Sequence, residues 1–247
     1  MEAAKNGTFV IALFDVLGFG ERVLSSGLSR LVVAYDRLLD IVDVPRSGAM
    51  LHCAVPDGNG GRAAAFGYLD IQCERFSDTV LLWSPYSRFS FGPFVGMCTR
   101  FVCDVLHLGM PIRAGVAVGE AHMDKSRRVF LGKPVVEADR VEKAQGWIGV
   151  SFGPSFARKP FNEYFEPDAV LVYTAHRKPG YSKWVPGLVL DWPRHWRKTY
   201  TVSPEAHLSQ MNTKPEYSKY YERAIHFCQF SRMNENWFAS GKLSAPS

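Results

Sequence analysis

The sequence lacks the motifs of several common enzyme classes. It has no G-x-x-x-x-G-K-[ST] loop and no G-x-S-x-G elbow, which argues against P-loop and α/β-hydrolase chemistry. The histidines share no spacing that suggests a zinc site. No apolar stretch reaches the roughly 18 residues that a membrane-spanning helix needs, so we expect no membrane partner.

The sequence also has few cysteines and only a small net charge. The five cysteines are odd in number and show no CxxC spacing, which predicts reduced thiols rather than disulfides or a zinc site. Residues 1–9 lack the basic start and long apolar core of a signal peptide, so we expect a cytoplasmic protein. The net charge of +5 suits an anionic ligand, but without long Lys/Arg runs it does not predict a nucleic-acid partner.

What the sequence does contain is an ordinary globular composition, 47% hydrophobic and 21% charged. Its 247 residues suffice for one substantial core, or for a core with an appendage. Regular patterning weakens after Pro154. We therefore predict a catalytic core over residues 1–153 and a C-terminal part, 154–247, that completes the core and adds an aromatic-rich helical extension.

Hydrophobic periodicity predicts alternating strands and helices. Strands are expected over 9–15, 69–76, 79–84, 112–119, 128–131, 148–152, 170–174 and 187–190. Helices are expected over 24–42, 94–108, 134–144 and 217–233. Residues 47–67 fit an irregular insertion or a hairpin. The order β-α-β-β-α-β predicts an α+β fold of the ferredoxin-like, split βαβ type, with an antiparallel sheet flanked by helices and a C-terminal extension.

Two apolar segments each carry one aspartate at a strand end: L-F-D-V-L-G-F-G at 13–20 and R-F-S-D-T-V-L-L at 75–82. Taken singly, Asp15 can be a helix cap and Asp78 a turn residue. Two carboxylates close together in an apolar frame are costly unless a cation compensates them. The pair therefore predicts a Mg²⁺ or Mn²⁺ site of the kind used in phosphoryl transfer.

The segment I-R-A-G-V-A-V-G-E at 112–120 places two glycines on one expected strand. A missing side chain there permits close approach of a ligand or of another backbone. For Gly115 and Gly119, ligand contact and tight packing against a facing helix both remain open.

The segment G-K-P-V-V-E-A-D-R at 132–140 places an arginine about two turns into an expected helix. The planar guanidinium of Arg140 could reach a polyphosphate. The alternative is an ion pair with Glu137 or Asp139.

Taken in order, these four segments resemble the motifs of class III nucleotidyl cyclases. Residues 14–19 are similar to the family's first metal motif, and 76–78 to its second. Residues 112–120 are similar to its R-x-G-I-x-x-G strand, and 132–140 to its G-x-x-V-N-x-A-x-R helix start. The match covers about residues 8–153. The resemblance implies a catalytic domain that works as a homodimer with active sites shared between protomers.

The resemblance also implies roles for single residues. Asp15 and Asp78 would hold two divalent cations, Mn²⁺ or Mg²⁺, helped by the Val16 carbonyl. The ribose 3′-oxygen of a nucleoside triphosphate would then attack the α-phosphorus and release pyrophosphate. Arg140 matches the transition-state arginine and would act from the opposite protomer.

The sequence departs from the family pattern at the residues that are expected to bind the nucleotide. The asparagine four residues before the arginine is Val136 here. The two purine-reading positions are Glu74 and Val129, a combination that matches neither adenylyl nor guanylyl cyclases. The late phosphate-binding lysine has no clear motif, and Lys178 and Lys183 are candidates.

A compact cyclase domain with an altered base pocket is similar to the pyrimidine cyclases of bacterial anti-phage Pycsar systems, which make cyclic UMP or cyclic CMP for a separate effector. This resemblance favours UTP as the substrate, with CTP next. Glu74 or Arg75, but not both, would contact uracil, and Tyr68 or Met50 would fill the space of a purine. The expected nucleotide-binding residues are Phe19, Gly20, Tyr68, Glu74, Arg75, Val129 and Val136.

Three other interpretations stay open at this point. GTP is a less favoured substrate, suggested by Glu74. A catalytically inactive cyclase-like domain could serve as a binding or dimerisation module, which the valine at 136 favours. A nucleic-acid-binding ferredoxin-like domain would need exposed stacking aromatics and a basic face, for which the sequence has only scattered candidates.

Overall fold

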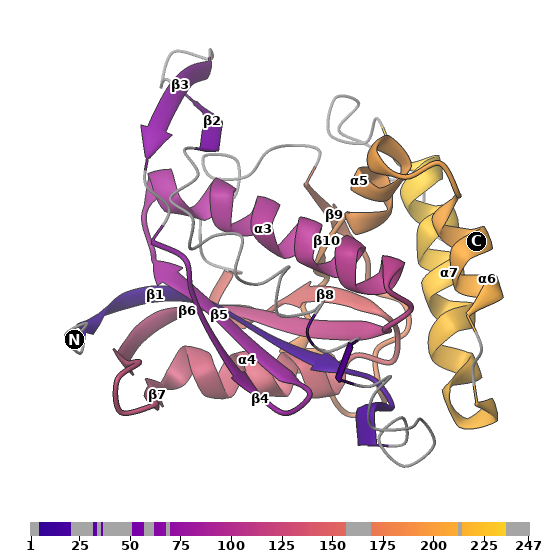
Figure 1. Ribbon diagram of the computed structural model, residues 1–247, viewed down its shortest axis with the longest axis horizontal. Coiled ribbons are helices and arrows are strands. Elements are labelled where there is room, and N and C mark those ends of the chain that lie inside the picture. The colour runs from indigo at the N-terminus through magenta and orange to yellow at the C-terminus, as the bar shows by residue number, and fades with distance from the viewer. Residues whose placement is uncertain are drawn as a thin grey trace.

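An eight-stranded sheet forms the centre of the fold (Figure 1). The computed structural model describes residues 5–20, 32–33, 36, 51–56, 62–67, 70–156, 169–211 and 214–235, with the backbone alone at 51–56, 62–67 and 88–89. The sheet order is β4-β5-β1-β6-β8-β10-β9, and β7 pairs with β6. The strands are β1 (Lys5–Val16), β4 (Gln72–Phe76), β5 (Thr79–Pro85), β6 (Ile112–Asp124), β7 (Val129–Gly132), β8 (Gly149–Phe152), β9 (Val170–Val172) and β10 (Leu188–Leu190).

The sheet order β4-β5-β1-β6 confirms the predicted ferredoxin-like plan. β5 lies antiparallel between β4 and β1, and β1 lies antiparallel between β5 and β6. β1 and β4 are therefore parallel with one strand between them, as a split βαβ arrangement requires. Beyond this core the sheet departs from a fully antiparallel pattern, because β6 and β8 pair in parallel.

The helix predicted over 24–42 falls in the connection between β1 and β4. Most of that range lies outside the described residues. The described residues of this connection that are helical are Phe19, Gly20, Val32, Val33 and Asp36.

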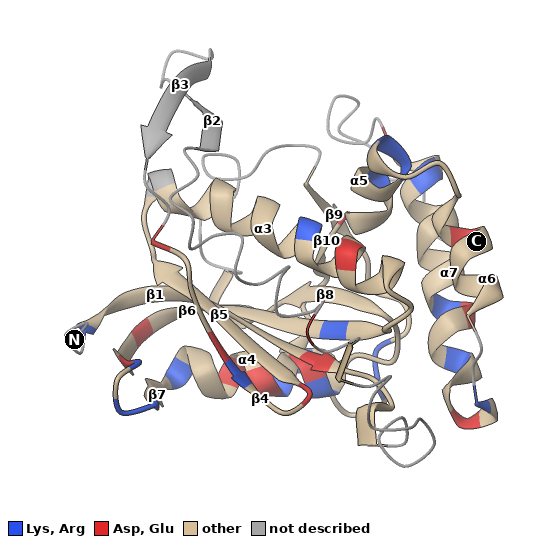
Figure 2. Cartoon of the chain, viewed as in Figure 1, with Lys and Arg blue, Asp and Glu red and all other residues tan. Residues whose placement is uncertain are grey.

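Different helices cover the two faces of the sheet (Figure 1). α3 (Arg88–His107) packs on the face that carries Ala12 and Phe14, and α4 (Lys133–Ala144) packs on the face that carries Ile11. Alternation of side chains along β1 produces this division. Charged residues are concentrated on α4, β4 and the C-terminal helices, whereas the central strands are nearly free of them (Figure 2).

Gly115 sets the distance between β6 and α4. A Cβ atom built on it would overlap the Ala138 carbonyl oxygen and lie 2.7 Å from the backbone nitrogen of Glu142. Packing against the facing helix therefore explains this glycine, and no ligand contact is needed.

We expect Gly115→Ala to lower the free energy of unfolding by about 1–3 kcal/mol or more, because helix backbone cannot yield as a flexible side chain can. Gly119→Ala is the matched control, since its nearest neighbour is Pro134 Cδ at 3.4 Å. Urea denaturation of both variants tests this. Equal stability of the two variants would contradict the packing explanation.

The C-terminal part shares the main apolar core of the sheet. After β10 the chain forms α5 (Trp192–Thr199), α6 (Pro204–Gln210) and α7 (Ser218–Met233), which gather at one end of the molecule (Figure 1). Trp192 and Phe227 from these helices are fully buried in the same cluster as the strand residues. The described C-terminal residues thus contribute side chains to the same apolar cluster as the strands.

Several predicted element limits need correction. α3 begins at Arg88 rather than at residue 94, because Ser87 and Ser90 form a capping box and Pro93 is accommodated inside the helix. Two short helices, α5 and α6, were not predicted. β6 runs on to Asp124 because it also pairs with β7.

The insertion at 47–67 contains a hairpin, one of the two predicted alternatives. β2 (Leu51–Pro56) and β3 (Arg62–Gly67) pair antiparallel as a separate two-stranded sheet. Their side chains lie outside the described part of the structure.

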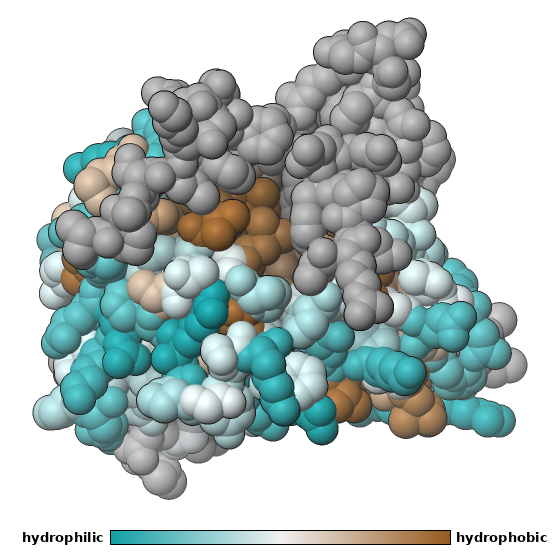
Figure 3. All heavy atoms as spheres, turned by 180° about the vertical axis from the view of Figure 1, so that it is seen from behind, coloured by the Kyte–Doolittle hydropathy of each residue, from teal (hydrophilic) through white to brown (hydrophobic). Residues whose placement is uncertain are grey.

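The remaining compositional expectations concern cysteines and membranes. The buried cysteines Cys98, Cys103 and Cys228 form no disulfide, as expected of reduced thiols, and Cys73 is buried as well. None of the described helices combines the length and the hydropathy that crossing a membrane requires. Seen from behind, the described surface is mostly hydrophilic, with brown restricted to a central patch and a few separate spots (Figure 3).

Candidate functional site

A cleft of about 750 Å³ opens where β1 and the β4–β5 hairpin end. We call it the aspartate cleft. It is lined by Asp15, Val16, Leu17, Gly18, Phe19, Gly20, Ser77, Asp78, Arg113, Lys178, Tyr217 and Tyr220. Five of the residues predicted from the sequence, Asp15, Val16, Phe19, Gly20 and Asp78, thus meet in one cavity.

The two aspartates reach this cleft from neighbouring strands. Asp15 pairs in the register with Thr79, the residue after Asp78. The Val16 N–H donates to the Asp78 carbonyl oxygen at 3.1 Å and so fastens the hairpin to β1. Ser77 has a left-handed φ of 58°, which lets the hairpin turn within two residues. A strand end and a tight turn therefore hold both carboxylates at one cavity.

The electrostatic environment of Asp15 favours a bound cation. Burial raises the pKa of Asp15, an ion pair with Arg113 at 3.3 Å opposes that rise, and the nearby Asp78 adds to it. A partly buried carboxylate next to a second carboxylate is stabilised in its ionised form by additional positive charge. One arginine alone does not offset the cost of burial here.

Two charged residues that the sequence interpretation did not assign organise this site. Arg113 lies directly opposite Asp15 in the β1–β6 register. Its Nη2 pairs with Asp15, and its Nε forms an ion pair with Oε1 of Glu142 on α4. Glu142 is only 2% exposed. A signal was available, because Glu142 follows the buried Ala138 by four residues and so lies on the same helix face.

Burial raises the pKa of Glu142 to about 7, although Arg113 acts to lower it. The folded protein thus binds a proton at Glu142 more tightly than the unfolded chain does. The free energy of unfolding is therefore expected to fall as the pH rises from about 4.5 to about 7, by on the order of 3 kcal/mol from this group.

Glu142→Gln keeps the side-chain shape and cannot ionise, so it should remove this part of the pH dependence. Urea denaturation of both proteins at pH 5 and pH 8, with EDTA present, measures the difference. Other titrating groups cancel in the comparison. A stability difference between the two proteins that is the same at both pH values would contradict the assignment.

Three of the residues predicted to contact the base, Glu74, Arg75 and Val129, do not line the aspartate cleft. Glu74 on β4 forms an ion pair with Arg128 at 3.7 Å, next to Val129 at the start of β7. Arg75 projects from the opposite face of β4, as alternation requires. Its Nη1 atom is buried without a hydrogen-bond partner among the described residues. Glu74 is thus paired with the residue that precedes Val129, whereas Arg75 points to the other face of β4.

Arg140 and Val136 lie one turn apart on the exposed side of α4. The Arg140 guanidinium lies over the Trp184 ring, 4.7 Å from its centroid, and the Lys183 ammonium lies 5.4 Å from the same centroid. None of these four residues lines the aspartate cleft of its own chain. Arg140 and Lys183 therefore form a second cationic group, separate from the aspartates.

The acidic residues next to Arg140 have other partners. Asp139 pairs with Lys143 at 2.7 Å, one turn further along α4. Glu137 accepts a hydrogen bond from the backbone N–H of Ser155 at 2.8 Å. Within the described part of the chain, the arginine is thus held by Trp184 rather than by either carboxylate.

The two candidate phosphate lysines fall at different places. Lys178 lines the aspartate cleft, whereas Lys183 accompanies Arg140 at Trp184. Tyr68 and Met50, proposed to fill the space of a purine, lie outside the described residues.

The donor set of the aspartate cleft fits divalent cations that prefer oxygen. It offers the carboxylates of Asp15 and Asp78, with the Val16 carbonyl at the same strand end. Among the described residues, no three His, Cys, Asp or Glu side chains come together to form a complete protein cage. Mg²⁺ is typically bound by one or two carboxylates plus substrate phosphates and water, which matches this arrangement.

Solved structures of similar outline include the adenylyl cyclase CyaB from Pseudomonas aeruginosa, 11% identical over 76% of this chain and 94% of that chain, with a TM-score of 0.43. A class III adenylyl cyclase-like ATP-binding protein from Pseudomonas aeruginosa is 14% identical over 62% of this chain and 34% of that chain, with a TM-score of 0.45. The catalytic core of a rhodopsin-guanylyl cyclase with converted specificity, in complex with ATPalphaS, is 12% identical over 62% of this chain and 81% of that chain, with a TM-score of 0.43. No family model and no curated protein matches the sequence. At these identities and TM-scores the similarities carry no weight by themselves, and the function of this chain rests on the geometry of the aspartate cleft.

Proposed function

We propose that this chain is a class III nucleotidyl cyclase that converts UTP to 3′,5′-cyclic UMP and pyrophosphate. The observation that carries the proposal is the meeting of Asp15 and Asp78 in one cleft, beside the turn at residues 17–18. The motifs around these residues occur in the order that class III cyclases have, on a ferredoxin-like sheet. CTP is the alternative substrate.

The reaction forms one bond and breaks one. The ribose 3′-hydroxyl gives its proton to solvent water, its oxygen attacks the α-phosphorus in line, and the bond from that phosphorus to the oxygen bridging to the β-phosphate breaks. Pyrophosphate leaves. Two divalent cations held by Asp15, Asp78 and the Val16 carbonyl would lower the pKa of the 3′-hydroxyl and offset the charge of the triphosphate.

The protein's own residues prepare this site. Arg113 opposes the protonation of Asp15 and holds its carboxylate toward β6. Glu142 in turn holds the guanidinium of Arg113 from the buried side. Both are positioning residues, since they act through Asp15.

A dimer would bring the second cationic group to the aspartates. The transition state needs positive charge near the transferring phosphorus, but Arg140 lies outside the aspartate cleft of its own chain. We therefore place Arg140 of one protomer at the cleft of its partner in a homodimer with shared sites. Exposed apolar side chains on α4, on β7 and at the end of β4 support a dimer interface on this side of the molecule. Val136 is 51% exposed, Leu131 62% and Phe76 43%.

The base assignment follows from what the purine-reading positions hold. Val129 has no group that could hydrogen-bond to a purine amine, and Glu74 is engaged by Arg128. A pyrimidine base, which is smaller than adenine, suits a site with these residues better than adenine does. One polar contact worth about 1–3 kcal/mol separates UTP from CTP. By the same resemblance, the cyclic product would act on a separate effector in bacterial anti-phage defence.

The test incubates purified protein with Mn²⁺ and equal concentrations of ATP, GTP, CTP and UTP, and identifies products by mass spectrometry. A dominant cyclic UMP peak is expected. A dominant cyclic CMP peak would keep the cyclase and change the base. No cyclic product from a preparation shown to be dimeric would contradict the enzyme assignment and favour a binding module, as the valine at 136 in place of an asparagine suggests.

A further inference from the structure

The start of α7 reaches the aspartate cleft from the far end of the chain. Tyr217 and Tyr220 line the same cavity as Asp15 and Asp78. Tyr217 is the N-cap residue of α7, and Tyr220 lies in its first turn. The C-terminal extension thus supplies part of the wall of the candidate active site.

Tyr217 lies against the turn that follows β1. Gly18 has a left-handed φ of 71°, and a Cβ atom on it would lie 3.2 Å from Cε2 and 3.4 Å from Cζ of Tyr217. Cζ is the carbon that bears the hydroxyl group. The absence of a side chain at Gly18 therefore lets the phenol end of Tyr217 lie directly beside the turn.

Tyr220 lies beside the arginine that positions Asp15. The guanidinium carbon of Arg113 is 5.8 Å from the centroid of the Tyr220 ring, within the range of a cation–π contact. Both tyrosine rings therefore have protein partners already. Their hydroxyl groups make no hydrogen bond with any described residue.

The two cationic residues that line the cleft, Arg113 and Lys178, differ in how many partners they have. Arg113 is paired with two carboxylates, Asp15 and Glu142. The ammonium group of Lys178 has no ion pair or hydrogen bond among the described residues, although it lines the same cleft. Lys178 and the two tyrosines thus border a cavity that also holds two acidic residues, and their ammonium and hydroxyl groups make no hydrogen bond or ion pair with a described residue. This combination suits a polyphosphate that carries divalent cations, since the donors meet the anion and the carboxylates meet the cations.

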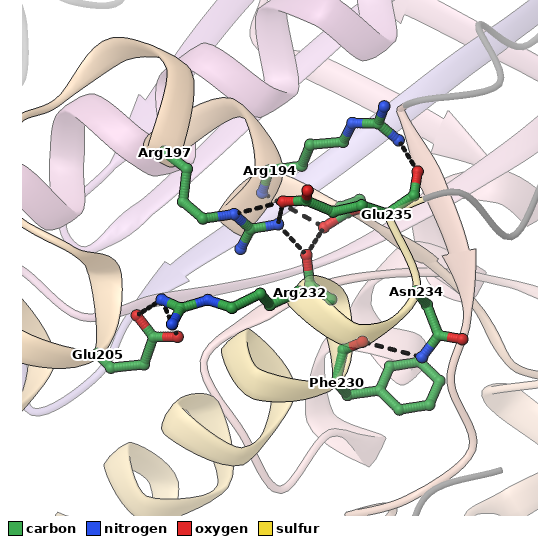
Figure 4. Close-up of polar contacts among 9 residues, drawn as sticks. Arg194, Arg197, Glu205, Phe230, Arg232, Asn234 and Glu235 are labelled. Atoms are coloured by element: carbon green, nitrogen blue, oxygen red, sulfur yellow. Dashed lines mark hydrogen bonds and ion pairs between the residues drawn. The ribbon is translucent and has the colours of Figure 1, made fainter. Parts of the chain in front are cut away.

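The other end of α7 is fastened firmly to α5 (Figure 4). Arg197 donates to the Glu235 carboxylate at 2.8 Å and to the Ser231 hydroxyl at 3.0 Å, and Arg194 donates to the Glu235 carbonyl at 2.7 Å. Arg232 adds a two-pronged contact with Glu205 of α6. These contacts fix the position of α7, so its first turn is held at the cleft before any ligand binds.

We propose that Tyr217, Tyr220 and Lys178 form a phosphate-binding wall that holds the β- and γ-phosphates of the nucleotide, and afterwards the pyrophosphate product. The inference rests on the proposed function for its substrate class. It assigns the C-terminal extension a direct role in the site. Phosphates suit this wall better than the base, because both rings are already in contact with protein and only hydroxyl and ammonium donors remain unpaired.

The test measures binding of inorganic tripolyphosphate in the presence of Mn²⁺ by isothermal titration calorimetry, so it needs no turnover. Lys178→Met is expected to weaken binding by about 10-fold, and the double variant Y217F/Y220F by about 5- to 20-fold. Lys219→Met is the matched control, since Lys219 lies between the two tyrosines in sequence, is exposed and does not line the cleft. It should bind as the wild type does.

The outcomes separate this inference from the proposed function. Unchanged affinity in Lys178→Met and Y217F/Y220F, or no tripolyphosphate binding by the wild type, overturns the phosphate-binding wall whatever the cyclase assay gives. Weakened binding in both variants but not in Lys219→Met supports it. If that result is obtained and no nucleotide is cyclised, the wall stands and the cyclase proposal fails. Phenylalanine retains both ring contacts, and thermal unfolding of each variant checks that the fold is intact.

Discussion

Asp78→Asn is expected to fold and to lose cyclase activity by about 10³-fold or more, a barrier increase of about 4 kcal/mol. The substitution removes one of the two carboxylates of the aspartate cleft and leaves the hairpin backbone in place, including the hydrogen bond from the Val16 N–H to its carbonyl oxygen. Cation binding should weaken in parallel, because an amide oxygen carries no charge. Initial rates with UTP and titration with Mn²⁺ measure the two effects.

Asp70→Asn serves as the matched control for this loss. Asp70 precedes β4 and pairs with Lys5 at 2.9 Å on an exposed part of the surface, outside the aspartate cleft. Removing a surface ion pair changes stability by at most about 1 kcal/mol, and activity should be retained. Substantial activity in Asp78→Asn would mean that the aspartates do not hold the catalytic cations.

An equimolar mixture of inactive Asp78→Asn with inactive Arg140→Gln is expected to recover about one quarter of the wild-type activity. With random exchange of protomers, about half of the dimers are mixed, and each mixed dimer has one site that retains both an aspartate pair and an arginine. The prediction follows from the separation of Arg140 from the aspartate cleft within one chain. Initial rates after protomer exchange measure it.

The double variant Asp78→Asn/Arg140→Gln, mixed with wild type, provides the control for exchange. With shared sites, each of the two sites in a mixed dimer lacks one of the two groups, so activity should fall with the square of the wild-type fraction; a fall in direct proportion would place each site within one chain. If mixed dimers are shown to form and the two single variants fail to complement each other, the site lies within one chain.

Local patterns were sufficient for the central part of the fold. The apolar run ending at Asp15 and the hairpin at Asp78 were predicted as strand ends, and the sheet pairs them in that way. The helix start at 132–140 and the strand at 112–119 were also located correctly to within a few residues, apart from the extension of the strand to Asp124. These elements have strong hydrophobic periodicity over their whole length, and short-range periodicity is what sequence patterns record.

The elements that were missed or misplaced depend on helix capping and tertiary packing rather than on periodicity. The start of α3 follows from a capping box at Ser87 and Ser90 placed before a proline that would ordinarily interrupt a helix. The short helices α5 and α6 contain too few turns for a periodic signal to emerge. Their position is decided by packing of residues such as Trp192 and Trp196 into the common core.

The sequence by itself determined which residue types could act and where they stand along the chain: two aspartates at strand ends, an arginine on a helix, and a departure from the purine-reading pattern. Only the tertiary structure decided which of them share a cavity. The pairing of Arg113 with both Asp15 and Glu142, and the arrival of Tyr217 and Tyr220 beside Gly18, join segments far apart in the sequence. Such contacts arise from sheet register and helix packing, which bring distant residues together without leaving a periodic signal in the sequence around them.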